Sequence, residues 1–115
     1  MQIDQGEHRH AAFLELNPHG RIPVLVDEGT GIVLFESAAI LLYLAEKFGR
    51  LLPDDHESRW LAITWLMFHA SSMGPLLGQR VHYELFDSTP NTAVIDRYQR
   101  LTEDTFATLD ARLQH

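Results

Sequence analysis

The sequence predicts an α+β fold in which a short β-hairpin and one apolar helix precede an all-helical part. Two apolar runs, residues 24–26 and 32–35, flank a turn that contains glycine, which is typical of paired strands. Beyond residue 36, apolar residues recur at three- and four-residue steps, which is typical of helices. The charged stretch RLLPDD separates the two parts. We therefore expect one domain at residues 1–50, a linker at 51–56 and a second domain at 57–115.

Composition narrows the class of protein. The chain has 115 residues, of which 45% are hydrophobic and 22% charged, enough to bury a core without disulfides. It has no cysteine, so any thiol chemistry must use the thiol of a ligand. The net charge of −7 argues against a nucleic-acid partner, because phosphate binding requires clustered Lys and Arg. Neither a signal peptide nor an apolar run of about 20 residues is present, so we expect no membrane contact and a cytoplasmic location.

The first half of the chain is expected to hold the hairpin. Residues 1–10 are polar and are predicted to be frayed, and residues 11–16 form a short helical turn. A turn follows at Asn17-Pro18 with Gly20. The two strands come next, joined by a loop at residues 27–31. The segment SAAILLYLAEKF, residues 37–48, predicts a mostly buried helix that ends at Gly49.

The second half is expected to be helical. One helix begins near Glu57, and Gly74-Pro75 is expected to kink or interrupt it. Trp60, Trp65 and Phe68 have helical spacing and are predicted to belong to the core. A break at residues 87–91 precedes a last helix at residues 92–113. Its apolar face is predicted to consist of Val94, Ile95, Tyr98, Leu101, Phe106, Leu109 and Leu113. A two-stranded hairpin is marginal alone, so we expect further strands from a larger sheet or a partner.

Two features at the ends of the hairpin carry chemistry. Pro23 opens the first strand, and the pattern alone favours strand punctuation with a trans bond. A cis bond would instead turn the backbone of Ile22 outward, where an extended peptide can pair with it. Glu36-Ser37 closes the second strand, and the pattern indicates Ser37 as a helix N-cap. The same helix start attracts a carboxylate while Glu36 attracts an ammonium, a combination that suits the amino-acid end of a ligand.

The stretch FLELNPHGRIPVLVDEGTGIVLFESAAILLYLAEKFG resembles the glutathione-binding half of a glutathione S-transferase. The later stretches WLMFHASSMGPLLGQRVHYE and IDRYQRLTEDTFATLDARL resemble the Ure2-like group of bacterial glutathione-dependent disulfide-bond oxidoreductases. The resemblance runs from Gly6 to the end of the chain. It implies a partial thioredoxin-like domain followed by part of an all-α bundle, glutathione as co-substrate, and a homodimer. It also implies that the chain is truncated at both ends.

The resemblance assigns roles to individual residues. It implies that Pro23 is the family's cis-proline and that the Ile22 backbone pairs with the cysteinyl part of glutathione. Glu36 and Ser37 match the pair that holds the γ-glutamyl end. Arg97, which the pattern alone indicates as an exposed helical arginine, matches a glutathione contact. His8 is also placed near the ligand, where the group usually carries glutamine.

No residue is matched to activation of the glutathione thiol, so the catalytic residues remain unassigned. In the family that group lies on a strand and helix that the matched stretch does not include. The seven histidines lack HExxH spacing, and we expect no metal site. His69 with Ser71 and Ser72 lacks the surroundings of a hydrolase triad.

Three hypotheses follow. The first is an enzyme that uses the glutathione thiolate for transfer to a small-molecule electrophile or for reduction of a disulfide. The second is a non-catalytic glutathione-binding or dimerising module, favoured by unpaired strand edges. The third is a fragment of a longer gene product that folds poorly alone, which a broad, non-cooperative melt would reveal.

Overall fold

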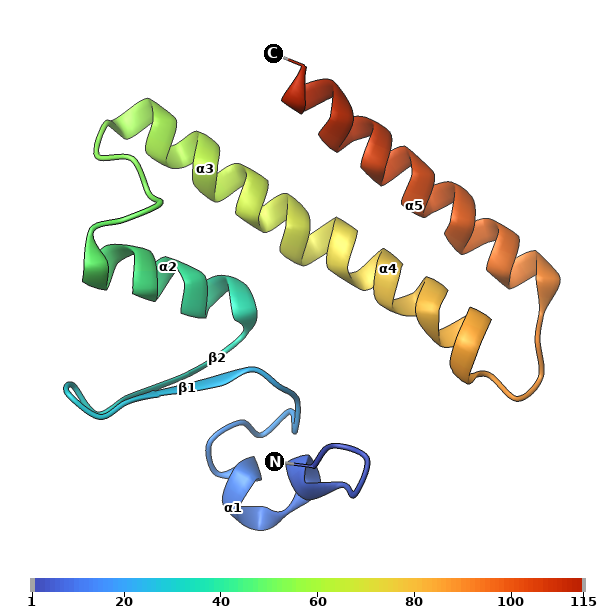
Figure 1. Cartoon of the computed structure of the whole chain (residues 1–115), viewed down its shortest axis with the longest axis horizontal. Helices are drawn as coiled ribbons and strands as arrows, with labels where there is room; N and C mark the ends of the chain where they lie inside the picture. The colour runs from blue at the N-terminus through green and yellow to red at the C-terminus, as the bar shows by residue number, and fades with distance from the viewer. Residues whose placement is uncertain (1, 115) are drawn as a thin grey trace. The chain divides into compact units, whose positions relative to one another are not determined.

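The computed structural model describes residues 2–114 and contains the predicted order of elements (Figure 1). Contacts within the chain form two compact units, Met1–Arg59 and Trp60–His115. The first unit holds a 3₁₀ turn η1 (Glu7–Arg9), helix α1 (Ala11–Leu14), strands β1 (Val24–Asp27) and β2 (Ile32–Phe35), and helix α2 (Ser37–Phe48). The α+β prediction is therefore confirmed, while the domain limits at 50 and 57 stay a prediction.

The hairpin has the predicted strands, with β1 one residue longer than expected. The strands are antiparallel, and Leu25 pairs with Leu34 while Val26 pairs with Val33. Because side chains alternate along a strand, Leu25 and Asp27 share one face and Val26 lies on the other. Asp27 hydrogen-bonds to α2, which identifies its face as the side that the helix covers.

Helix α2 has the predicted bounds but not the predicted burial. Only Ala38 and Ile40 are buried, whereas Leu41 is 52% and Phe48 64% exposed. The expectation of a mostly buried helix is therefore wrong for the described chain, because α2 packs on the hairpin along one side only. Gly49 ends the helix at a φ of 60°, which glycine adopts without strain.

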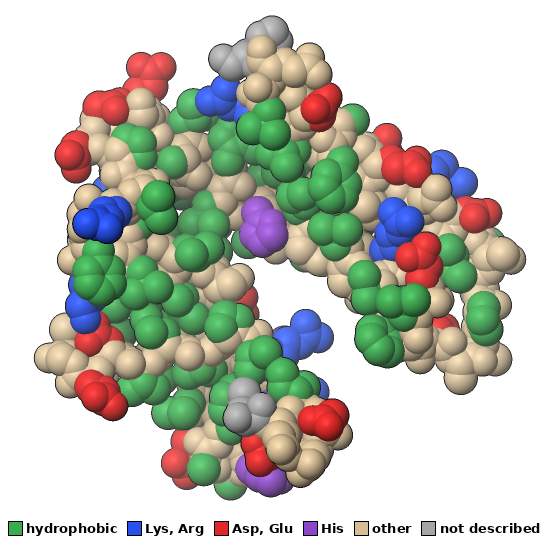
Figure 2. Space-filling view, viewed as in Figure 1, with side chains coloured by type: hydrophobic (Ala, Val, Ile, Leu, Met, Phe, Trp, Pro, Cys, Tyr) green, Lys and Arg blue, Asp and Glu red, His purple; other side chains and the backbone are tan. Residues whose placement is uncertain are grey.

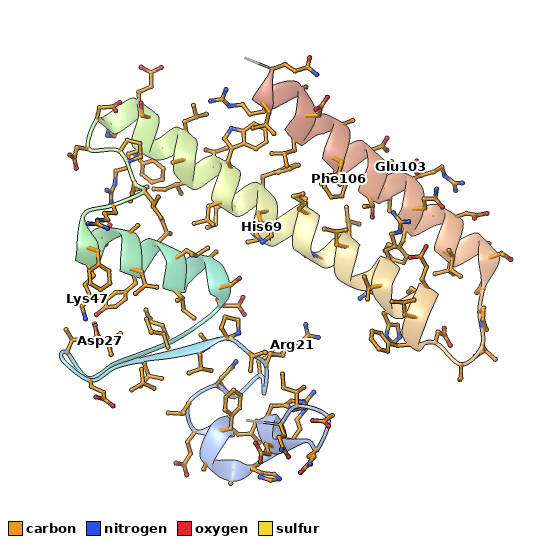
Figure 3. The ribbon with its side chains drawn as sticks, in the orientation of Figure 1. Arg21, Asp27, Lys47, His69, Glu103 and Phe106 are labelled. Carbon is orange, nitrogen blue, oxygen red and sulfur yellow. The ribbon has the colours of Figure 1, made fainter. Side chains whose placement is uncertain are left out.

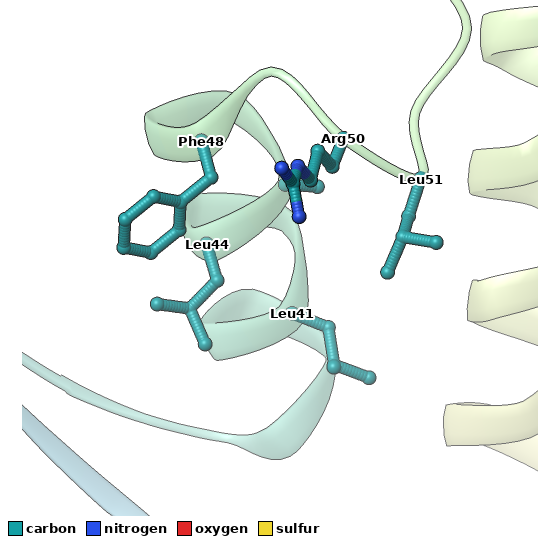
Figure 4. Close-up of a pocket in the computed structure, with 6 residues that line it drawn as sticks. Leu41, Leu44, Phe48, Arg50 and Leu51 are labelled. Carbon is teal, nitrogen blue, oxygen red and sulfur yellow. The ribbon is translucent and has the colours of Figure 1, made fainter.

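The outer side of α2 borders an apolar groove of about 500 Å³ (Figure 4). We call it the outer α2 groove, and it is lined by Leu41, Leu44, Ala45, Phe48, Arg50 and Leu51. Figure 2 shows hydrophobic side chains gathered on the visible face of the hairpin and α2. The groove offers one charged group, Arg50, and otherwise presents carbon to the solvent.

The second unit is helical from end to end. Helix α3 (His56–Phe68) begins in the first unit and continues through the π-helical turn η2 (His69–Met73), α4 (Gly74–Val81) and a second π-helical turn η3 (His82–Phe86). Helix α5 (Thr92–Leu113) runs back beside α4 (Figure 1). At Gly74-Pro75 the chain stays helical, but the α-helical pattern gives way to the π-helical turn η2 immediately before this pair. The predicted kink or interruption is therefore a local change of helix type and not a break.

The helical core is smaller than the apolar pattern indicated. Thr102 and Thr105 are the buried residues of α5, and Phe106 is 47% exposed. Trp60 is 56% exposed, so its prediction as a core residue is wrong. Tyr83 and Tyr98 stack with ring centroids 5.6 Å apart and join η3 to α5. Among residues 2–114, no helix has the length and hydropathy needed to span a bilayer.

Candidate functional site

The loop before β1 is built around the buried side chain of Asn17, which is 2% exposed. Its amide nitrogen donates to the carbonyl of Arg21 at 2.6 Å, and its oxygen accepts the N–H of His19 at 3.0 Å. The Asn17 carbonyl also accepts the Gly20 N–H at 2.9 Å. One residue therefore fixes both the turn and the carbonyl that follows it.

Gly20 lets this loop lie against the segment that precedes it. Its φ is 65°, and a Cβ there would approach the His8 carbonyl and side-chain atoms of Arg9 and Leu14 at 3.1 Å. A larger residue would be strained and crowded at once. The Arg9 guanidinium donates to the His19 carbonyl at 3.4 Å, which adds a further link between the same two segments.

The Ile22-Pro23 peptide bond is cis, as the resemblance implied and the pattern alone did not favour. Ile22 is 51% exposed. No hydrogen bond within residues 2–114 uses the N–H or the carbonyl of Ile22. Both backbone groups are thus available to an extended ligand, in the way that a sheet edge accepts a strand.

The start of α2 differs from the sequence prediction in one respect. The N-cap position is occupied by Glu36, and Ser37 is the first helical residue. No side chain caps this helix start, so the prediction of Ser37 as N-cap is wrong. Glu36 has φ 70° and ψ 113°, a conformation that a residue with a side chain adopts only at a cost of about 1–3 kcal/mol. The free N–H groups of the first turn remain open to an anion.

These two segments meet in one hollow of about 190 Å³, which we call the cis-proline hollow. Four of the six predicted binding residues line it, and so do three residues that the sequence did not single out. Its lining consists of Asn17, His19, Arg21, Ile22, Pro23, Glu36 and Ser37. Figure 3 shows where Arg21 projects beside the start of the hairpin. The hollow thus presents a carboxylate, a guanidinium, a hydroxyl and free backbone groups together.

A second hollow of about 300 Å³ adjoins the same loop, and we call it the His8 hollow. Arg21 and Ile22 line both hollows. The Nδ1 atom of His8 is buried and has no hydrogen-bond partner. The rest of its lining is Ile3, Arg9 and Gly20. His8 therefore lies beside Ile22, within the 3₁₀ turn η1.

Arg97 belongs to α5, in the other unit, and its side chain is exposed. It is not among the residues that line either hollow. Its role as a glutathione contact stays a prediction. Within residues 2–114, no group of three or more His, Asp or Glu side chains has the arrangement of a metal site.

A charged cluster holds the far end of the hairpin. Asp27 is 8% exposed and accepts hydrogen bonds from Lys47, Tyr43 and the backbone N–H of Gly29, the last at 3.0 Å. Figure 3 shows Asp27 and Lys47 pointing toward one another. The hydrogen bond from Lys47, followed by that from Tyr43, holds the pKa of Asp27 well below its usual range, and Asp27 raises the pKa of Lys47. The cluster ties the hairpin loop to α2, whose first residues line the cis-proline hollow.

Asn17, Arg21 and His19 were missed as site residues. Asn17 was interpreted only as part of a turn, because an Asn-Pro pair is a common turn signal. The sequence signal that could have indicated Asn17 is its spacing. Its amide side chain lies four residues before Arg21, which adjoins the exposed backbone of Ile22. That spacing means little until the loop closes and brings the Arg21 carbonyl to the amide.

Residues 2–47 match the family model described as the glutathione S-transferase N-terminal domain. Across the full chain, the sequence is 35% identical to the disulfide-bond oxidoreductase YfcG of Escherichia coli and covers 56% of that protein. It is also 33% identical to the transcriptional regulator URE2 of Saccharomyces cerevisiae, over 85% of this chain and 30% of URE2. The chain thus spans about half the length of YfcG and less of URE2.

Solved structures agree with the sequence comparisons. A glutathione transferase from Burkholderia graminis, with two glutathione molecules bound per subunit, matches 98% of this chain with a TM-score of 0.94 and 34% identity. Ure2p in complex with glutathione matches 96% of the chain with a TM-score of 0.91 and 30% identity. The chain covers 50% and 53% of those two structures, respectively. Residues 2–47 thus match the glutathione S-transferase N-terminal domain, and by sequence and fold together the chain is similar to YfcG and Ure2p over nearly its whole length.

Proposed function

We propose that the chain binds glutathione in the cis-proline hollow and uses the thiolate of this co-substrate for transfer to electrophiles or for reduction of disulfides. One observation carries the proposal: a single hollow gathers Glu36, Ser37 and the exposed backbone of Ile22 beside the cis-proline. The glutathione-bound relatives support the choice of ligand. The reaction rests on the resemblance, and the proposed cytoplasmic location rests on the sequence pattern, which offers neither a signal peptide nor a long apolar run.

The γ-glutamyl end of glutathione carries an ammonium and a carboxylate on one carbon. In the proposed complex the ammonium contacts the carboxylate of Glu36. The carboxylate accepts hydrogen bonds from Ser37 and the first N–H groups of α2, at the positive end of the helix dipole. The strained backbone of Glu36 supports this role, because such conformations persist where the surroundings impose them.

The cysteinyl unit lies in the middle of the tripeptide and pairs with the N–H and carbonyl of Ile22. The glycyl carboxylate then reaches Arg21 and the His8 hollow, which shares Arg21 and Ile22 with the cis-proline hollow. The unpartnered Nδ1 atom of His8 is a polar group that a ligand can satisfy. Arg97 is proposed as a further contact from α5.

Calorimetric titration with reduced and then oxidised glutathione tests the binding. We expect wild type to bind with a Kd between micromolar and millimolar, which corresponds to roughly −8 to −4 kcal/mol. Glu36→Ala removes the ammonium partner and is expected to abolish measurable heat. Glu28→Ala is the matched control, because Glu28 is an exposed carboxylate in the hairpin loop and does not line the hollow. A folded wild type that gives no heat with either ligand would end the proposal.

The reaction is tested separately. Conjugation of glutathione to an aryl halide and reduction of a small disulfide are the two assays, each run with Glu36→Ala beside wild type. Binding without turnover in either assay would leave a glutathione-binding module without catalysis.

The exposed apolar face of the hairpin favours a second candidate function, which is assembly as a homodimer. Val26, Val33 and Phe35 are 47%, 41% and 38% exposed, on a sheet of only two strands. Surfaces of this kind favour association. Sedimentation of wild type and Val33→Lys tests it: the variant is expected to stay monomeric at concentrations where wild type dimerises. Identical sedimentation of the two proteins would remove this candidate.

A further inference from the structure

We propose that Asn17 is a positioning residue for glutathione, which sets the direction of the Ile22 backbone by holding the Arg21 carbonyl and the His19 N–H. This inference rests on the proposed function and adds a positioning residue to the same site. Asn17 lines the cis-proline hollow, but its two strong hydrogen bonds are made to the loop that presents Ile22.

The first step of the argument is the chemistry of the side chain. Asn17 is 2% exposed, and it donates and accepts at the same time. Both backbone groups that it satisfies belong to the loop at residues 19–21. Loss of the amide leaves them without these partners in a poorly hydrated place, which is costlier than loss of an exposed hydrogen bond.

The second step is the place of the bonds in the loop. The Arg21 carbonyl belongs to the peptide unit that immediately precedes Ile22, so the 2.6 Å bond fixes the orientation of the Ile22 N–H. A rotation of that unit would turn the N–H away from the ligand. Ligand binding is sensitive to such small displacements, because a contact must be held within about 0.5 Å of its productive geometry.

The third step is that other contacts cannot replace Asn17. The Gly20 N–H bond to the Asn17 carbonyl at 2.9 Å survives any change of the Asn17 side chain, and it reaches only Gly20. The other remaining links to this loop are the Gly20 backbone packing and the hydrogen bond from Arg9, at 3.4 Å. Both hold the near side of the loop at His19 and Gly20. Neither one reaches the Arg21 carbonyl.

Two substitutions separate positioning from simple destabilisation. Asn17→Ala removes both bonds without adding charge, and it is expected to raise the Kd for reduced glutathione about tenfold or more. Asn17→Asp keeps the acceptor for His19 but places a carboxylate oxygen against the Arg21 carbonyl. Protonation turns that oxygen into a donor, so acidification is expected to restore affinity in Asn17→Asp and not in Asn17→Ala.

The titrations are run with reduced glutathione on wild type and both variants between about pH 7.5 and about pH 5, a range that a desolvated carboxyl can reach. His8, His19, Arg9, Arg21 and Glu36 surround the loop and are present in all three proteins, so their common effect is removed by comparison with wild type. Asp55→Ala is the destabilised control, because it removes the acceptor of the Ser58 N–H at the start of α3, away from both hollows.

The outcomes are distinguishable. If wild type does not bind glutathione, the proposed function fails. Suppose wild type binds and Asn17→Ala binds equally well, or Asn17→Asp shows no recovery on acidification relative to wild type. Then the positioning role is overturned while the proposed function stands. Weakened binding in Asp55→Ala equal to that in Asn17→Ala would also overturn it, since lower stability would then explain both.

Discussion

Glu36 combines two properties at one residue, a backbone with φ 70° and a carboxylate in the cis-proline hollow. Glycine would adopt that positive φ with less strain, yet it would offer no charge to a ligand. The residue is therefore better suited to binding than to folding. Such conflicts between local preference and structure are expected at functional sites.

The strain at Glu36 can be measured by two substitutions. Glu36→Gly is expected to be more stable than Glu36→Ala by about 1 kcal/mol, because only glycine tolerates the positive φ. Neither variant should bind glutathione. Urea unfolding followed by circular dichroism measures the difference, and equal stabilities would show that the backbone at position 36 relaxes when the side chain is removed.

Asp27 predicts a dependence of stability on pH. Hydrogen bonds from Lys47 and then Tyr43 hold its folded pKa below the usual value of about 4, so the carboxylate stabilises the fold above that pH. This stabilisation is lost as the pH falls toward the folded pKa. We expect Asp27→Asn to melt below wild type at neutral pH and the gap to narrow below about pH 4.

Thermal melts across this range check the prediction, with Glu28→Gln as the matched control on the exposed side of the same loop. A constant gap between Asp27→Asn and wild type at every pH would contradict the assignment. The loss would then come from packing rather than from the charge of Asp27.

At the scale of elements, local sequence signals were enough to predict where helices α2 and α5 begin and end. Helices α2 and α5 begin and end at the predicted residues, because a turn signal and a change of period mark each limit. Asn91 is the start signal of α5, because its side-chain oxygen accepts a hydrogen bond from the Val94 N–H. Neither π-helical turn was predicted as such, although η2 directly precedes Gly74-Pro75, where the sequence predicted a kink or an interruption.

The site was less predictable than the elements. Ile22, Pro23, Glu36 and Ser37 were named from a family resemblance, and the pattern alone would have left Pro23 trans. Asn17 was missed because its partners are backbone groups of a loop, which no periodicity reports. The burial of α2 was overestimated, because apolar residues on all sides of a helix do not reveal how many sides are covered.

Gly74 and Gly78, both in α4, give a matched pair of predictions. A Cβ at Gly78 would meet nothing within 4 Å, whereas one at Gly74 would lie 3.3 Å from the His69 carbonyl, in η2. Gly78→Ala is therefore expected to stabilise the chain by about 0.5–1 kcal/mol. Gly74→Ala should gain less, because that carbonyl must move. Urea unfolding of both variants tests this, and a larger gain at Gly74 would contradict the described π-turn.

At the scale of the whole molecule, little hydrophobic surface is fully covered. Among residues 2–114, Ala38 and Ile40 are the buried hydrophobic residues, while many larger ones are well exposed. The outer α2 groove, the hairpin face and Trp60 all present carbon to the solvent. A chain of this kind is expected to gain stability from association.

Trp60 reports on such association. It is 56% exposed, so acrylamide should quench its fluorescence efficiently in dilute solution. If α3 contributes to the contact, quenching is expected to fall as the protein concentration rises. Trp60→Phe leaves Trp65 as the remaining tryptophan and separates the two signals. Quenching that does not change over the range where sedimentation detects dimers would place the contact elsewhere.

The Asp27 cluster and the Asn17 loop determine where this chain can be recombined with a related sequence. Every partner in these two sets of bonds lies between Asn17 and Lys47. A recombination crossover within residues 17–21 or within residues 27–47 would part an anchor from its counterpart, whereas one at residues 22–26 or at the charged stretch after Gly49 would leave each set together. Residues 17–21 and residues 27–47 therefore behave as two cassettes, each of which chimeric proteins can exchange whole but not in pieces.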